Sequence, residues 1–198
     1  MNDRPHHRPM TPGGKFFAEI AGGADPAQLR EAGDLAATIL VRGARAEHDP
    51  GLVERIVHLA DSEGLETLAE VWSGAPADTL SGSLWRLFLL RSWVHANPTR
   101  VALDYDAGQR RAEVARVVAG VADPPGPDEL RAMVDEVLRG IAGGDFAVTL
   151  FRAAAFARIV AAGRAALGEA THEEIVRMLT MSEQLEAAGH LEIRHALA

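Results

Sequence analysis

Cysteine is absent from the 198 residues, and Lys15 is the only lysine. A chain without thiols cannot form disulfides, thiolate metal sites or a cysteine nucleophile, and the absence of cysteine fits a reducing compartment. The formal net charge of −8 argues against a protein that coats nucleic acid, because such a protein needs an excess of basic residues. We therefore expect a soluble, cytoplasmic protein for which nucleic acid is not a favoured partner.

Long apolar runs are also missing. The most apolar stretch, residues 84–94, is interrupted by Arg86 and Arg91, and it falls far short of the ~20 apolar residues that cross a bilayer. The N-terminal residues lack the apolar segment of a secretory signal. The sequence thus predicts no membrane-spanning segment and no membrane partner.

Strand signals are nearly absent, since alternating runs of β-branched residues do not occur. Helical signals are frequent: Thr171 and Glu174, for example, form the pattern of a capping box. Residues 52–60, 114–118 and 130–141 each have the periodicity of an amphipathic helix. The fold class that we expect is all-α, a compact multi-helix bundle of seven to nine helices.

Three parts of the chain are distinguished by composition. Residues 1–14, rich in proline and glycine, predict a disordered arm. Residues 15–168 predict the helical domain, in which the proline-rich segment 122–127 is a stiff corner between two helices. Residues 169–198 predict a C-terminal helical extension that serves for packing or dimerisation.

Two segments differ from the amphipathic helices. Around residues 84–96 and 145–167 the apolar side chains point in nearly every direction when they are projected at 100° per residue. A helix that is apolar all round is enclosed by other helices or by a partner subunit. We therefore place these two helices at the centre of the bundle.

Charge is segregated along the chain. No acidic residue lies between Asp78 and Asp104 or between Asp145 and Glu169, although both windows contain arginines. Residues 25–78, by contrast, hold eleven carboxylates and four arginines. Because the arginine-rich windows contain the two apolar helices, their guanidiniums need counter-charges from elsewhere in the fold.

Two interpretations of these arginines are open. The guanidiniums reach outward or pair with carboxylates of the surrounding helices, as buried charges commonly do. Alternatively, several of them meet in a cleft between the central helices and bind a small anionic ligand such as a phosphate or a carboxylate. Arg158 projects away from the arc of Arg152 and Arg164 and should have a specific partner. The candidate ligand-binding residues are Arg86, Arg91, Arg152 and Arg158.

No catalytic, metal or cofactor site is recognisable. His172-Glu173-Glu174 lacks the second histidine of a zinc-protease helix. Asp104 and Asp106 would diverge by about 200° on a helix and could not converge on one substrate atom. The serines of Ser81–Ser83 fit a turn and a helix cap better than a nucleophile. The sequence favours a protein that is not an enzyme and that has no cofactor.

Residues 114–131 superficially resemble a DNA-binding helix-turn-helix. Gly120 comes five residues after Ala115, however, whereas the motif places this glycine four residues after the alanine. The second helix would begin with Pro127, Asp128 and Glu129, and these carboxylates would repel DNA phosphates. A DNA-associated regulator is the third of our functional hypotheses for these reasons.

Several segments together resemble an uncharacterised all-helical protein family of high-GC bacteria. They are Leu84-Trp85-Arg86-Leu87 through Trp93, Val114 to Val118, Asp123 to Pro127, Gly144 to Ala147 and Ala153 to Phe156. The resemblance covers roughly residues 28 to 168 and leaves the C-terminal segment as an addition. Members carry labels such as DNA-binding or polymerase-associated, which no motif here supports. No catalytic residue can be transferred, and the family has no established activity.

These observations rank three hypotheses. The first is a non-enzymatic interaction or regulatory protein whose partner is another protein or a second copy of the chain. The second is a module that binds a small anionic ligand, and the third is the DNA-associated regulator. The helix that begins near Thr171 carries Met178 and Met181, which suit either a subunit contact in a homodimer or the filling of the chain's own core.

Overall fold

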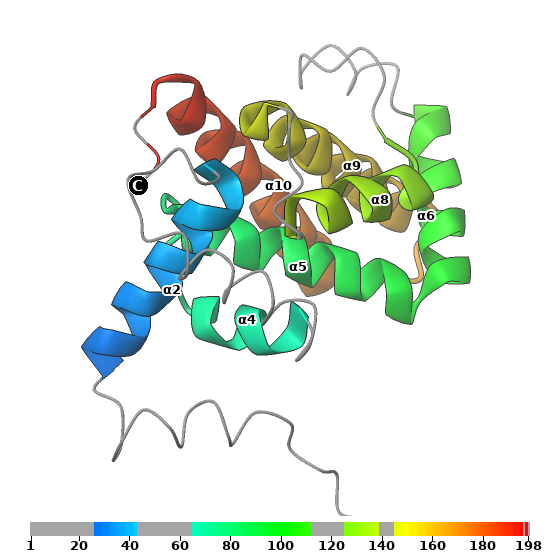
Figure 1. The fold of residues 1–198 in the computed structure, drawn as a ribbon. Helices are drawn as coiled ribbons and strands as arrows, with labels where there is room; N and C mark the ends of the chain where they lie inside the picture. Colours follow the sequence, from blue (N-terminus) through cyan, green and yellow to red (C-terminus); the bar gives the residue numbers. More distant parts are fainter. Residues whose placement is uncertain (1–25, 43–64, 112–124, 139–144, 196, 198) are drawn as a thin grey trace, which may run out of the picture.

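The structure, a computed structural model, describes the chain except for residues 1–25, 43–64, 112–124, 139–144, 196 and 198. The described ranges contain seven α-helices and no strand, so the predicted all-α bundle is confirmed (Figure 1). The predicted arm and the predicted helices at 52–60 and 114–118 lie outside these ranges. The helices are α2 (Pro26–Arg42), α4 (Leu65–Trp72), α5 (Leu80–Ala96), α6 (Pro98–Arg111), α8 (Pro127–Leu138), α9 (Phe146–Leu167) and α10 (His172–Ile193).

Local polar groups set the ends of the helices. Thr79 caps α5, because its hydroxyl accepts a hydrogen bond from the Gly82 amide at 3.0 Å. The carboxylate of Asp145 caps α9 in the same way, and α9 ends at Gly168, whose φ of 69° is left-handed. The capping box predicted at Thr171 opens α10. The four-residue connection between α9 and α10 therefore begins with the C-cap of α9 and ends with the N-cap of α10.

The serines near the start of α5 do not have the role expected of them. Ser81 and Ser83 lie inside the first turn of the helix and are buried, so the prediction that they form the turn and the cap was wrong. Ser81 donates a hydrogen bond to a carboxylate oxygen of Asp34 at 2.6 Å and thereby joins α5 to α2. Ser83 donates to the backbone oxygen of Thr79 at 2.9 Å. Thr79, which precedes both serines, is the N-cap of α5 because it has the extended backbone that a cap requires.

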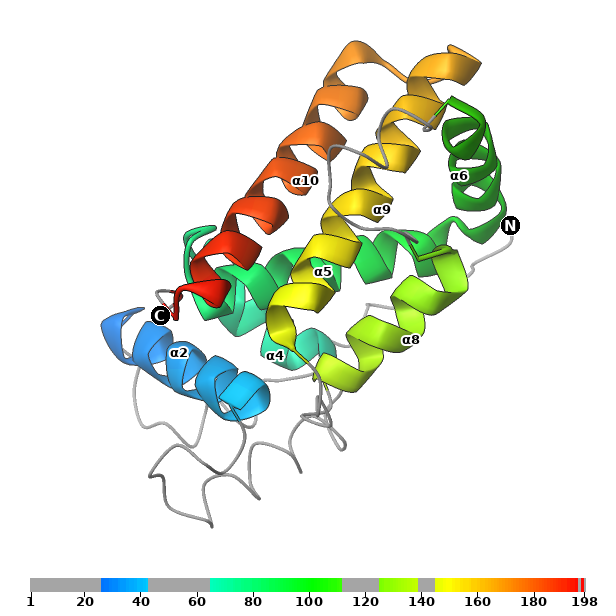
Figure 2. The ribbon, with the colours of Figure 1, turned by 90° about the horizontal axis from the view of Figure 1, so that it is seen from above.

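The two all-round apolar helices occupy the middle of the bundle. α5 contacts every other helix of the described ranges, and it passes between α2 and α4 on one side and α8, α9 and α10 on the other (Figure 1). α9 lies between α10 and α6 (Figure 2). Its small residues allow these neighbours to approach closely. The fully or nearly fully buried ones are Ala147, Ala153, Ala154, Ala155, Ala157, Ala161 and Gly163.

α9 is also long and apolar. By length and composition it could cross a membrane, and it is the one helix in the described part of the chain that meets this criterion. The prediction that no segment crosses a membrane stays a prediction, but residues 84–94 are not the chain's strongest candidate by length and composition. Other helices of the chain bury 67% of its most apolar window, as they do for the core helix of a soluble protein.

Candidate functional site

Three of the four arginines predicted to bind an anion face carboxylates of neighbouring helices. Arg91 of α5 pairs with Asp135 of α8. Arg158 of α9 pairs with Glu186 of α10 at 2.5 Å. Arg152 of α9 has a longer contact of 3.8 Å with Glu129 of α8. The counter-charges thus come from helices outside the two acid-poor windows, as the segregation of charge required.

Arg86, the fourth of these arginines, donates to neutral acceptors. Its Nε bonds the side-chain oxygen of Gln184 at 2.7 Å, and its Nη1 bonds the backbone oxygens of Gly82 and Ala75 at 2.8 and 3.4 Å. Burial lowers the pKa of Arg86, and the charge of Asp78 opposes that shift. The four guanidiniums therefore have four different partners, on α8 and α10, and no common partner brings them together.

Glu186 explains an irregularity in the sequence of α10. The residue falls on the side of the helix that is otherwise apolar, and it does so because Arg158 needs a partner there. Beside this pair, the buried hydroxyl of Ser182 donates to the backbone oxygen of Ala154 at 2.9 Å. Glu186 and Ser182 of α10 thus bind α9, whereas Gln184 accepts from Arg86 of α5 and the buried Glu192 pairs with Arg42 of α2.

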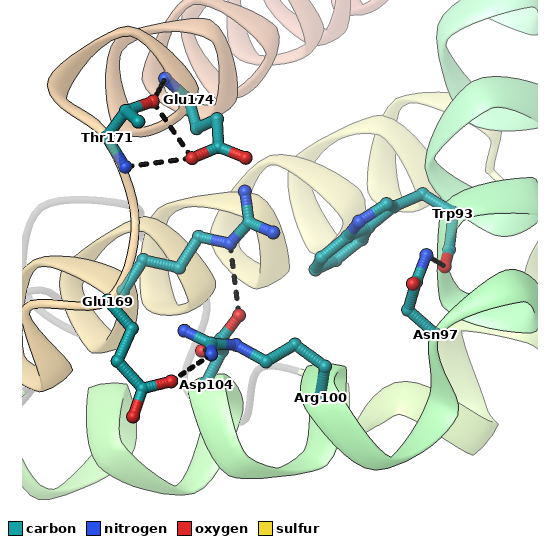
Figure 3. A network of polar contacts seen from close by, with 8 residues as sticks. Trp93, Asn97, Arg100, Asp104, Glu169, Thr171 and Glu174 are labelled. Atoms are coloured by element: carbon teal, nitrogen blue, oxygen red, sulfur yellow. Dashed lines mark hydrogen bonds and ion pairs between the residues drawn. The ribbon is translucent and has the colours of Figure 1, made fainter.

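A second cluster of charges surrounds Asp104 of α6, which is 0% exposed (Figure 3). Its two carboxylate oxygens accept hydrogen bonds from Nε of Arg100 at 2.9 Å and Nε of Arg164 at 3.0 Å. Arg164 also lies over the ring of Trp93, 4.8 Å from its centroid. Arg100 pairs in addition with Glu169, and the hydrogen bond to Glu169 is the main cause that raises the pKa of Arg100.

This Asp104 cluster is electrically balanced. Two arginines face two carboxylates, and the buried carboxylate accepts from both guanidiniums. A balanced cluster has no excess charge with which to attract an anion or a cation. Its residues come from α6, from α9 and from the segment that leads into α10, so its action is to fasten these elements together.

Two glycines place Asp104 at the closest approach of α6 and α9. A Cβ atom on Gly163 would lie 1.7 Å from the backbone oxygen of Asp104, and one on Gly108 would lie 1.9 Å from that of Ile159. No other residue leaves room for such a contact between backbones. The carboxylate is buried beside this close approach, and its hydrogen-bond partners among the described residues are the two guanidiniums.

α10 carries exposed apolar side chains. Val176 and Leu179 are 42% and 38% exposed, and Ile193 near the end of the helix is 58% exposed. α10 packs along α9 (Figure 2), and at 100° per residue Val176 and Leu179 project from the side of α10 opposite its buried residues. Ala187 and Glu183 continue the same exposed face toward the C-terminal end.

A hollow of about 210 Å³ lies beside this face, and we call it the α10 hollow. Its walls are almost wholly apolar, and Asp78 and Glu183 are acidic residues among those that line it. Gln184, which accepts the hydrogen bond from Arg86, forms part of one wall. The remaining lining residues are Ala77, Ala187, Ala188 and Leu191.

Sequence reasoning missed the Asp104 cluster, although two signals for it were present. Asp104 closes an acid-poor window and follows Arg100 by four residues, which puts the two side chains on one helical face. Gly108 lies one turn further along the same face. The pairing of Asp104 with Arg164, 60 positions away, could not be read from spacing. Groups of histidines, aspartates and glutamates that could hold a metal ion do not occur among the described residues.

Comparison of the chain with models of protein families, with curated proteins and with solved structures found no match. The resemblance to a helical family of high-GC bacteria therefore stays a prediction. What can be said of function comes from the geometry described above.

Proposed function

We propose that the protein is a non-enzymatic interaction or regulatory protein that works as a homodimer, with the outer face of α10 as its subunit contact. The exposure of Val176 and Leu179, side by side on one face of an outer helix, is the observation that carries the proposal. Apolar side chains grouped on a charged surface are typical of protein contacts.

The use of the charged residues supports this proposal over a small-anion site. Arg91, Arg152 and Arg158 each face a carboxylate of a neighbouring helix, although the buried Nε of Arg152 and Nη1 of Arg158 have no hydrogen-bond partner among the described residues. For a DNA contact, the first turn of α8 exposes Asp128 and Glu129, which would repel phosphates.

The proposal is tested by the concentration dependence of the molar mass. A contact made by one helix from each copy is smaller than the roughly 1,600 Å² of a standard interface, so we expect a dimer with a dissociation constant on the order of micromolar or weaker. Sedimentation equilibrium of the full chain should therefore show a shift from monomer to dimer as the concentration rises into that range.

Two matched variants locate the contact. Leu179→Glu places a charge on the outer face of α10 and should leave a monomer at every concentration. Leu103→Glu places the same charge at a residue that is 57% exposed on α6, on the other side of α9, and should dimerise like the parent (Figure 2). A parent protein that stays monomeric up to millimolar concentration would overturn the proposal, and so would equal dimerisation of both variants.

A further inference from the structure

The chain changes direction immediately after α10. Arg194 is the C-cap of the helix, and His195 has a φ of 52°, a left-handed conformation that usually belongs to glycine at the end of a helix. His195 is the one residue other than glycine with a positive φ in the described part of the chain. The turn is held by the amides of Arg194 and His195, which donate to the backbone oxygens of Leu191 and Glu192 at 3.1 and 2.9 Å. Such a conformation is strained, so another contact has to stabilise it.

Leu197 supplies that contact. Ile193, Arg194 and His195 are exposed, whereas Leu197 is 4% exposed and belongs to the hydrophobic core. Its backbone oxygen accepts a hydrogen bond from Nη2 of Arg42 at 3.4 Å. Arg42 is the last residue of α2, and the end of α10 lies beside this helix (Figure 2). In the described part of the chain, one buried side chain and one long hydrogen bond thus connect Leu197 to the bundle.

Glu192 orients Arg42 for its contact with Leu197. Nη1 and Nη2 of Arg42 each donate to one carboxylate oxygen of Glu192, and the Nη2 bond is 2.7 Å long. This hydrogen bonding is the main cause that raises the pKa of Arg42, and Glu192 is itself 7% exposed. Nη2 is therefore shared between the carboxylate of Glu192 and the backbone oxygen of Leu197. A guanidinium that a buried carboxylate fixes in this way is already in place when Leu197 docks.

From these contacts we infer that Leu197 is the anchor of a latch that opens without unfolding of the bundle, with Arg42 as its catch. Burial of one leucine favours the docked state by roughly ten- to a hundredfold, and the strain at His195 reduces this preference about fivefold. A small domain favours its folded state by roughly a thousandfold or more. The latch should therefore open far more often than α9 unfolds, while Glu192 stays paired with Arg42.

Amide hydrogen exchange of the full chain, followed by NMR, measures this opening at Arg194 and His195. Their protection should be roughly a hundredfold or more below that of the buried α9 amides. Leu197→Ala removes the anchor and should lower the protection of both amides by about tenfold, with α9 unchanged. Ile193→Ala is the matched control, because Ile193 is an aliphatic residue of the last turn of α10 that is 58% exposed, and it should leave the protection as in the parent.

Two further variants test the turn and the catch. His195→Gly should raise the protection by about fivefold, because glycine adopts the left-handed conformation without strain. Arg42→Lys keeps a positive charge beside Glu192 but lacks the fork that reaches both partners, and it should lower the protection by about threefold. Since the lost contact is made to Leu197, Arg42→Lys should have a smaller effect in the Leu197→Ala background.

The latch is supported if Leu197→Ala speeds exchange at Arg194 and His195 and Ile193→Ala does not. It is overturned if these amides are as protected as those of α9, because Leu197 would then leave its place only when the whole bundle unfolds. Equal exchange in Leu197→Ala and Ile193→Ala also overturns it. An effect of Arg42→Lys that is the same in both backgrounds would remove Arg42 from the role of catch.

Discussion

α6 and α10 pack on opposite sides of α9, and they are held there in different ways (Figure 2). α6 meets α9 backbone to backbone at Gly108 and Gly163, and a fully buried carboxylate is fastened by two arginines at that point. α10 lies along α9 through side chains, with an ion pair between Arg158 and Glu186 whose side chains are 19% and 25% exposed. The contact between α6 and α9 should therefore tolerate few substitutions, whereas side chains in the contact between α10 and α9 can shift to accommodate them.

Gly163→Ala should have the largest effect of the changes considered, because the new Cβ would lie 1.7 Å from a backbone oxygen of α6. Overpacking against backbone that cannot move should lower the free energy of unfolding by about 3 kcal/mol or more. Urea denaturation measures the loss as a lower midpoint. Alanine in a helix otherwise stabilises by up to about 1 kcal/mol relative to glycine, so a decrease in the free energy of unfolding would show that the backbone clash outweighs the gain in helical propensity.

Gly189→Ala on α10 is the matched change at the other contact. Its Cβ would lie 2.9 Å from the ring of Phe151, a half-buried side chain that can shift. The higher helical propensity of alanine then offsets much of the strain, and the free energy of unfolding should change by about 1 kcal/mol or less in either direction. Equal losses for the two variants would contradict the distinction between a rigid contact and an adjustable one.

The electrostatic half of the comparison is tested by Asp104→Asn and Glu186→Gln. Asp104 is 0% exposed, and its neutralisation leaves two guanidiniums without their shared acceptor, so we expect a loss of about 3 kcal/mol. Glu186 is 25% exposed, and water can replace part of its interaction with Arg158, so we expect a loss of about 1 kcal/mol. Both values can be read from urea denaturation at neutral pH.

The adjacent carboxylate supplies the control for this pair of variants. Asp106 lies two residues from Asp104 but is exposed, and Asp106→Asn should change the free energy of unfolding by less than about 0.5 kcal/mol. A loss for Glu186→Gln as large as that for Asp104→Asn would show that burial does not separate the two ion pairs.

The sequence predicted the fold better than it predicted the charged clusters, for physical reasons. All-round apolarity identified α5 and α9 as central, because a helix without a polar side has to be enclosed. The same reasoning required a partner for Arg158. Glu186, which lies on the mainly apolar side of α10, is that partner. Glu186 could be seen as an irregularity, but the fold was needed to join it to Arg158.

Asp104 illustrates the limit more clearly. Its exposure is decided by how closely two helices approach, and that distance depends on which glycines face each other across the contact. Periodicity gives the direction of a side chain on its own helix, but it does not give the partner helix or the depth of the contact. The proposed anion site had the same weakness, since Arg86, Arg91, Arg152 and Arg158 were chosen by helix and charge alone.

The start of α10 lies at the surface and depends on its capping box. The Thr171 amide donates to the Glu174 carboxylate at 2.8 Å, and the Glu174 amide donates to the Thr171 hydroxyl at 3.3 Å. Thr171→Ala removes the cap and should cost about 1 kcal/mol of unfolding free energy. Asp104 lies outside the box, so the tight contact of α6 should persist in this variant.

The pH dependence of the capping box follows from Glu174. The backbone hydrogen bond from Thr171, followed by the hydroxyl bond, lowers the pKa of Glu174 below its ordinary value of 4.5. A lowered pKa in the folded state means that the carboxylate stabilises the fold fully above pH 4.5 and loses this effect as the pH falls through the lower value. Glu174→Gln should therefore be less stable than the parent at pH 7, and the gap in melting temperature should narrow by pH 3. A gap that is the same at both pH values would mean that the carboxylate does not hold the start of α10, and the hydroxyl of Thr171 alone would then define where this adjustable helix begins.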